Sequence, residues 1–129
     1  MKHVPPWIPE DAKWYLAEIV METKFDGDYD NLIENNLTLV RADSPEDAYL
    51  KALLLGQESE LIYDNTDGEK VTVLFRGLHN LHVIHDELEH GGEILYEKYE
   101  RVSDDTLAKM ITPKELLAVF APREVSDDE

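Results

Sequence analysis

Four histidines close together, His79, His82, His85 and His90, are the residues of this sequence whose types best suit a chemical site. Neutral imidazoles and the acidic residues beside them are ordinary ligands of zinc and related ions. The spacing argues against a shared ion, because steps of three place His79 and His85 on one face of a strand and His82 on the other. The segment also lacks the i, i+4 histidine pair of H-E-x-x-H enzymes. We therefore predict no metal ligand here and interpret His79 to His90 as a polar strand edge and loop. A small metal-dependent enzyme that uses this segment is the alternative.

Alternating acids at Asp26, Asp28 and Asp30 resemble the start of a calcium-binding EF-hand loop. Asn31 stands where that loop needs glycine, and Leu37 stands where it needs the bidentate glutamate. The pattern therefore predicts a turn rather than a calcium site.

The sequence also offers no candidate residue for nucleophilic catalysis. The sequence has neither a G-x-S-x-G motif nor a glycine-rich phosphate loop, and Ser44 and Ser103 are better explained as helix caps. It has no cysteine, which excludes disulfides and thiolate chemistry. We expect no catalytic residue and no cofactor.

The charge balance restricts the partners. Twelve basic residues against 29 acidic residues give a net charge of −17, which repels the phosphates of nucleic acids. No apolar run approaches the roughly 20 residues of a membrane span, and the first residues lack the apolar core of a signal peptide. We expect a cytoplasmic protein that binds neither nucleic acid nor membrane. The charge fits a basic partner protein, and it also fits solubility or adaptation to a salty cytoplasm.

Strands and helices that would position any site can be predicted along the chain. Alternation from Trp14 predicts a long strand with Tyr15, Ala17, Ile19 and Met21 on one face. Further strands are expected where apolar alternation or apolar runs recur, at 36–42, 61–63, 71–75, 78–84 and 93–101.

The start of the main helix is the clearest local pattern in the chain. Ser44 can accept from free amides, Pro45 suits the first helical position, and the acids that follow face the positive end of the helix dipole. Ala48, Ala52 and Leu55 form a core-facing stripe, and Gly56 is expected to end the helix.

The C-terminal part is expected to be helical. Ser103 opens a short helix through Ile111, and a capping box at 112–115 opens a second one to Phe120.

These elements predict an α+β fold: an antiparallel sheet of about five strands, one main helix at about 44–56 packed on a face, and short C-terminal helices. We expect one domain over 1–129. Its parts are a Pro-rich arm (1–13), the sheet and central helix (14–102), C-terminal helices (103–121) and an acidic tail (122–129).

Several short motifs occur in order between about Trp14 and Glu97. They are Trp14-Tyr15-x-Ala17, Ala42-Asp43-Ser44-Pro45-Glu46-Asp47-Ala48-Tyr49-x-Lys51-Ala52, Asp67-Gly68-Glu69, Gly77-Leu78 and Gly92-Glu93. Together they resemble the bacterial family called domain of unknown function 4288. The resemblance implies strands around one central helix, but it supplies no activity and no catalytic residues.

The outer side of the main helix carries the candidate binding residues. Leu50 and Leu54 lie opposite the core-facing stripe, so either the C-terminal helices cover them or they are exposed for a partner or a second subunit. With Glu46 and Asp47 they form our candidate partner-binding set. The leading hypothesis is a non-enzymatic acidic protein that binds a basic protein, as an inhibitor or a toxin-neutralising partner. A structural role through self-association is a further alternative.

Overall fold

The computed structural model describes residues 8, 11–27 and 30–120, which form an α+β fold. The chain divides into two compact units, 1–96 and 97–129, and each is described here by itself. Most of the expected Pro-rich arm and all of the acidic tail lie outside the described residues. That the whole chain folds as one domain stays a prediction.

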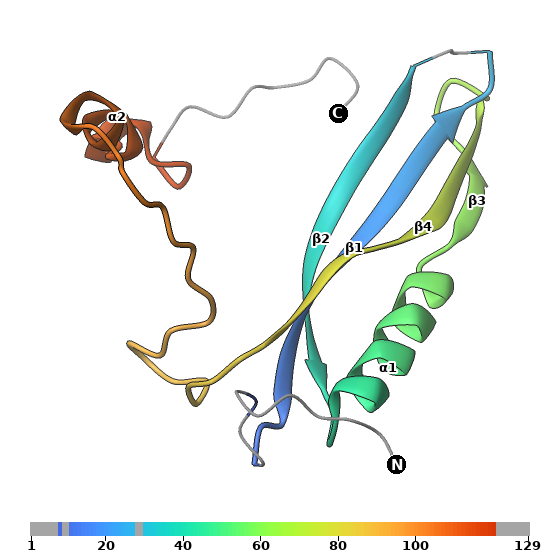
Figure 1. Cartoon of the computed structure of the whole chain (residues 1–129). Helices are drawn as coiled ribbons and strands as arrows, with labels where there is room; N and C mark the ends of the chain where they lie inside the picture. The colour runs from blue at the N-terminus through green and yellow to red at the C-terminus, as the bar shows by residue number, and fades with distance from the viewer. Residues whose placement is uncertain (1–7, 9–10, 28–29, 121–129) are drawn as a thin grey trace. The chain divides into compact units, whose positions relative to one another are not determined.

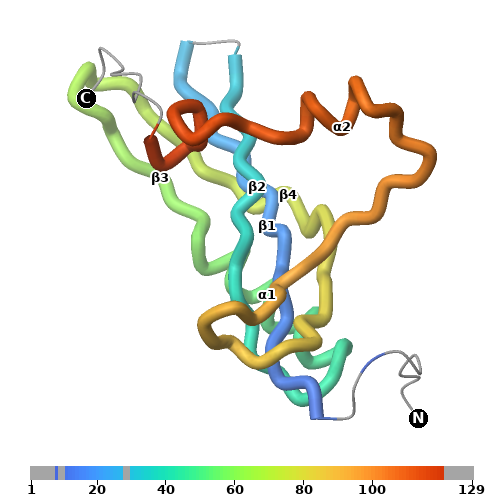
Figure 2. The backbone as a smooth tube through the Cα atoms, turned by 90° about the vertical axis from the view of Figure 1, so that its left-hand side faces the viewer, coloured from blue at the N-terminus to red at the C-terminus, as the bar shows by residue number. Residues whose placement is uncertain are grey.

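The first unit is built on a four-stranded antiparallel sheet (Figure 1). Its strands are β1 (Trp14–Phe25), β2 (Asn31–Arg41), β3 (Leu61–Asp64) and β4 (Lys70–Val83), in the spatial order β2-β1-β4-β3. Figure 2 shows the same strands from the side, where β1 lies beside β2 and β4. The hairpins predicted at 14–42 and 61–75 are confirmed. The second strand starts at Asn31 rather than at residue 36, because it pairs with β1 along its whole length.

The prediction of about five strands was wrong for two reasons. The apolar runs at 71–75 and 78–83 belong to one strand, β4, which pairs with the long β1. Their pairing has two irregularities, at Glu18/Ile19 and at Val20/Met21. Gly77 lies at the second irregularity with a φ of 135°, a backbone conformation that glycine adopts without strain. Residues 93–100 form no strand, although their composition resembles one.

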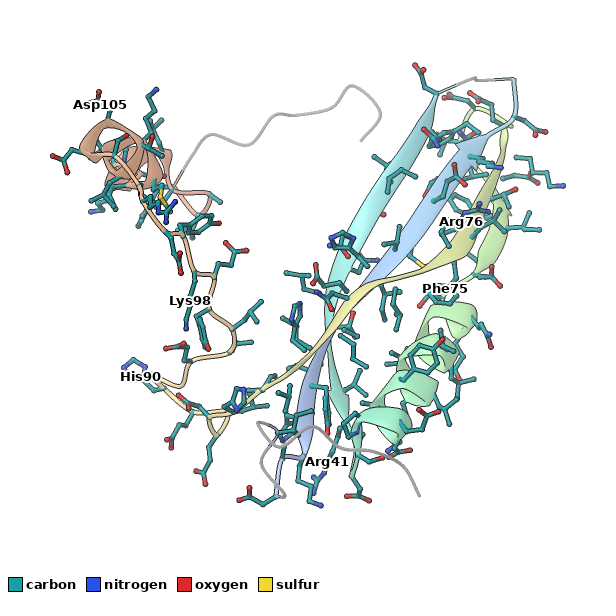
Figure 3. All side chains as sticks on the ribbon, viewed as in Figure 1. Arg41, Phe75, Arg76, His90, Lys98 and Asp105 are labelled. Atoms are coloured by element: carbon teal, nitrogen blue, oxygen red, sulfur yellow. The ribbon has the colours of Figure 1, made fainter. Side chains whose placement is uncertain are left out.

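The main helix, α1 (Pro45–Glu58), begins as predicted. The Ser44 hydroxyl accepts a hydrogen bond from the Asp47 amide at 3.1 Å, and Pro45 takes the first turn. The helix does not end at Gly56, as the sequence suggested, but continues to Glu58. Gly56 is buried, and a Cβ atom there would clash with ring carbons of Phe75, which Figure 3 labels. The glycine therefore allows a close approach between α1 and β4.

The core lies between α1 and one face of the sheet. The predicted inward face of β1 is confirmed, since Tyr15, Ala17, Ile19 and Met21 are all buried. Small residues on the helix let it approach the sheet closely, and the cluster is completed by Val40, Ala42, Ala48 and Ala52.

The second unit contains α2 (Asp104–Met110) and the 3₁₀ helix η1 (Lys114–Leu116). Ser103 caps α2 as expected, with its hydroxyl accepting from the Thr106 amide at 3.2 Å. The predicted helix to Phe120 shortens to one turn, and Pro113 rather than Thr112 occupies its cap without a side-chain hydrogen bond. Neither helix contains a buried residue. Short helices in proteins are stabilised mainly by packing, so the absence of buried side chains explains why η1 stays one turn long.

Candidate functional site

The outer side of α1 presents the two leucines that the sequence singled out. Ala48, Ala52 and Gly56 face the sheet, and a turn of 100° per residue places Leu50 and Leu54 opposite them. Their exposed fractions are 54% and 53%. That the C-terminal helices cover these leucines stays a prediction, because the placement of the second unit relative to the first is not determined.

The two acids of the candidate set lie differently. Glu46 is exposed on the flank of the leucine pair, and it faces solvent. Asp47 is half-buried and engaged within the helix start, where its Oδ2 accepts from the Asp43 amide at 3.3 Å and lies 3.4 Å from Lys51 Nζ. Lys51 also donates to the Arg41 carbonyl at 2.9 Å. The charge of Lys51 is therefore paired within the protein, and the surface beside the two leucines stays acidic.

The four histidines differ in exposure. His79, His85 and His90 are exposed, whereas His82 is half-buried on the sheet face opposite α1, where it contacts Glu18. His79 also contributes to lowering the pKa of Glu18. Figure 3 labels His90 in the loop that follows β4. Within the part of the chain that the structure describes, no group of three or more His, Cys, Asp or Glu side chains could hold a metal ion.

The sheet face opposite α1, which we call the open face, holds a hydrogen-bonded group that sequence reasoning missed. Glu18 accepts from Asn35 at 2.9 Å, and its other oxygen lies 2.5 Å from His82 Nε2. The hydrogen bonds from His82 and then from Asn35 lower the pKa of Glu18. The alternation of β1 placed Glu18 on this face, but only the register brings Asn35 and His82 to it from the two neighbouring strands.

A second group of the same kind lies on the open face four residues further along β1, around Glu22. Glu22 is almost buried, accepts from Asn31 at 2.5 Å and lies 3.6 Å from Arg76 Nε. Glu18 with Asn35 and Glu22 with Asn31 follow the same diagonal across the β1–β2 pair. The carboxylates are thus held in place by neighbouring side chains, which stabilises the sheet and occupies their acceptor atoms.

Apolar side chains surround these polar groups. Ile33, Leu37 and Leu39 of β2 lie on the open face with exposed fractions of 53%, 64% and 46%. The open face therefore combines hydrogen-bonded polar groups with exposed apolar side chains, whereas the face towards α1 forms the buried core.

A shallow hollow of about 300 Å³ lies at the end of the sheet where β1 begins and β2 ends. The Arg41 guanidinium lies 5.8 Å from the centre of the Trp14 ring at its rim, and Figure 3 labels Arg41 there. Beside it, Lys13 Nζ lies 2.9 Å from Asp43 and lowers the pKa of that carboxyl. Charges of both signs line the rim, so the hollow favours no single class of ligand.

Residues 14–96 match the model of a protein family described as Domain of unknown function (DUF4288). The chain belongs to this family. The resemblance seen in the sequence motifs is thereby confirmed, and the DUF4288 match ends at Tyr96, where the first compact unit ends. No curated protein and no solved structure matches the chain. No helix in the described part of the chain is long and apolar enough to cross a membrane.

The residues that carried the DUF4288 resemblance mostly build the fold. Tyr15, Ala17, Ala48 and Ala52 are buried between β1 and α1. Ser44 caps the helix. These positions explain how the DUF4288 unit folds, and the candidate binding residues Leu50 and Leu54 lie outside this buried set.

Proposed function

We propose that this protein is a non-enzymatic binding protein whose acidic surface engages a basic partner protein through the outer side of α1. The observation that carries the proposal is the exposure of Leu50 and Leu54 at the positions directly opposite the core-facing residues of the helix. Apolar residues at the centre of a patch with a polar rim are the usual anatomy of a protein interface.

Charge determines the kind of partner. Glu46 flanks the leucines, and Lys51, the nearby cation, is held by Asp47 and by the Arg41 carbonyl. The chain as a whole carries a net charge of −17. A field of this sign accelerates association with a positively charged protein and repels an acidic one. A basic protein that offers an apolar anchor to Leu50 and Leu54 fits both features.

The biological role that follows is inhibition or neutralisation of that basic partner in the cytoplasm. An inhibitor needs a stable interaction surface rather than a catalytic group, and the leucine pair lies on a capped, well-packed helix. No contact among the described residues favours the metal-dependent alternative over binding.

The test is a pull-down from host lysate at low and high salt, followed by measurement of Kd with each purified partner. The wild-type protein is compared with a variant carrying Leu50→Ser and Leu54→Ser. Ile62→Ser on β3 is the matched control, since Ile62 is also exposed and apolar but lies on another element.

The proposal predicts that basic proteins are captured at low salt and released at high salt. The double variant should bind the same partner at least about tenfold more weakly, and Ile62→Ser should bind normally. Capture of no basic protein at low salt, or equal binding by the double variant, would contradict the proposal.

A further inference from the structure

The outer edge of β2 carries backbone groups that point away from the sheet. Ala42 donates to the Lys13 carbonyl at 2.9 Å, which fixes the side of the strand that pairs with β1. The register between β1 and β2 continues without interruption from Arg41 to Asn31. Because hydrogen-bonding direction alternates along a strand, Leu39, Leu37 and the other odd-numbered residues direct their N–H and C=O groups outward.

Within the strand itself, the features that usually prevent strand pairing are missing. Natural edge strands are protected by proline, bulges, charged side chains or short length. β2 is 11 residues long with no bulge against β1. Between Asn31 and Val40 the sequence has no proline and one charged residue, Glu34. Protection is seen at one end, where Lys51 donates to the Arg41 carbonyl.

We propose that β2 pairs antiparallel with β2 of a second copy of this chain, with Asn36 opposite Asn36 at the twofold axis. The two four-stranded sheets then form one continuous sheet. This register pairs all of Asn31–Arg41 with the same residues of the other copy. The outward-pointing odd residues meet each other, as an antiparallel pair requires.

The side chains of β2 are complementary to themselves in this register. Ile33 lies opposite Leu39 on the open face, and the twofold axis forms this apolar pair twice. Cross-strand apolar pairs of this kind stabilise a sheet. Glu34 lies opposite Thr38 and not opposite another carboxylate.

Charge restricts where two copies can meet. Outside β2 the chain is strongly acidic, and its copies repel each other. The strand with few charges is therefore the surface on which two copies approach at least electrostatic cost. This inference does not rest on the proposed function, which uses the outer side of α1.

The experiment measures the mass of the full chain in solution by light scattering and analytical ultracentrifugation over a range of concentrations. Leu37→Glu adds one charge in the middle of β2, and Leu54→Glu adds the same charge to α1 at a similarly exposed leucine. Leu37→Glu should raise the dimer Kd by at least about tenfold, whereas Leu54→Glu should leave it unchanged. Leu37→Pro, which removes an outward-pointing N–H and no bond to β1, should also give a monomer.

Hydrogen exchange gives a readout specific to the edge. In the dimer, the outward amides of Ile33, Asn35, Leu37 and Leu39 should become protected as concentration rises. The inward amides of Asn36 and Thr38 should be protected at every concentration, because β1 already pairs with them. Dimerisation should strengthen with salt, since salt screens repulsion between the acidic copies.

Three results would overturn the proposal. One is a monomer at all concentrations, and another is a dimer that persists in both Leu37→Glu and Leu37→Pro. A dimer that Leu54→Glu dissociates would instead place the contact on α1. Far-UV circular dichroism of each variant verifies that loss of the dimer is not loss of the fold.

Discussion

The two faces of β1 differ although one strand supplies both. Residues facing α1 are apolar or small and almost completely buried, as Ile19 and Ala17 illustrate. Residues on the open face include Glu18 and Glu22, which are held by side chains from β2 and β4. One face is stabilised by close packing against the helix. The other is stabilised by hydrogen bonds and ion pairs between strands, and Leu16 and Glu22 are buried there as well. The comparison shows that β1 buries side chains on both faces, and that the carboxylates of the open face are held by its two neighbouring strands.

Truncation of an apolar side chain should distinguish the two faces most strongly. Ile19→Ala should lower the free energy of unfolding by about 2–5 kcal/mol, because it leaves a cavity under α1. Ile33→Ala on the open face should cost less than about 1 kcal/mol, since Ile33 is half exposed. Urea denaturation of both variants measures the difference. Equal losses would mean that the open face is packed as tightly as the core.

The close approach of α1 to β4 should respond to added volume. Gly56→Val should cost about 1–3 kcal/mol, because the new side chain meets the Phe75 ring. Phe75→Leu in the same chain should recover part of this loss, which a double-mutant cycle measures. Leu54→Val is the control for the lower helix propensity of valine at an exposed site. Costs that simply add would contradict a direct contact.

The polar group on the open face should show a smaller coupling. Side-chain exposure is 22% for His82 and 16% for Glu18. After allowance for solvent screening we expect a coupling free energy of about 1 kcal/mol between Glu18→Gln and His82→Ala. Thermal or urea unfolding of the four proteins in the cycle measures it. Asn35→Ala provides a comparison on the other oxygen of Glu18, and zero coupling would remove His82 from the group.

The smallest effect should be a dependence on pH. The pKa of Glu18 is lower in the folded protein than in the unfolded chain, so its ionised form favours folding. This contribution is fully present above the unfolded pKa of a glutamate, and it disappears as pH falls through the lowered folded pKa. The stability difference between wild type and Glu18→Gln should therefore shrink in acid. Measurement of both proteins from pH 7 to pH 3 tests this, and a constant difference would contradict it.

Local patterns accounted for much of the fold. The start of α1 was predictable because Ser44 and Pro45 act through bonds within one turn. The buried face of β1 was predictable because side chains alternate along a strand. The strand count and the end of α1 were not, because they depend on distant partners. β4 is one strand because β1 pairs with it throughout, and Gly56 continues the helix because it packs against Phe75.

The candidate binding residues divide in the same way. The outward position of Leu50 and Leu54 follows from helical periodicity, so the sequence alone could identify them. Asp47 and Lys51 form an i, i+4 pair that helical spacing also predicts. The bond from Lys51 to the Arg41 carbonyl, and the meeting of Glu18 with His82, required the tertiary structure. Glu18 and His82 are 64 positions apart, and no local rule relates them.

Four features could be read from the sequence alone: the acidic charge, the family, the capped start of the main helix and the inward face of the first strand. Each of these depends on composition or on residues within a few positions of each other. The tertiary structure decided the register between strands, and with it the polar groups of the open face and the outward-pointing edge of β2. Register joins residues far apart in the chain, and it is set by the packing of all elements together rather than by any one of them.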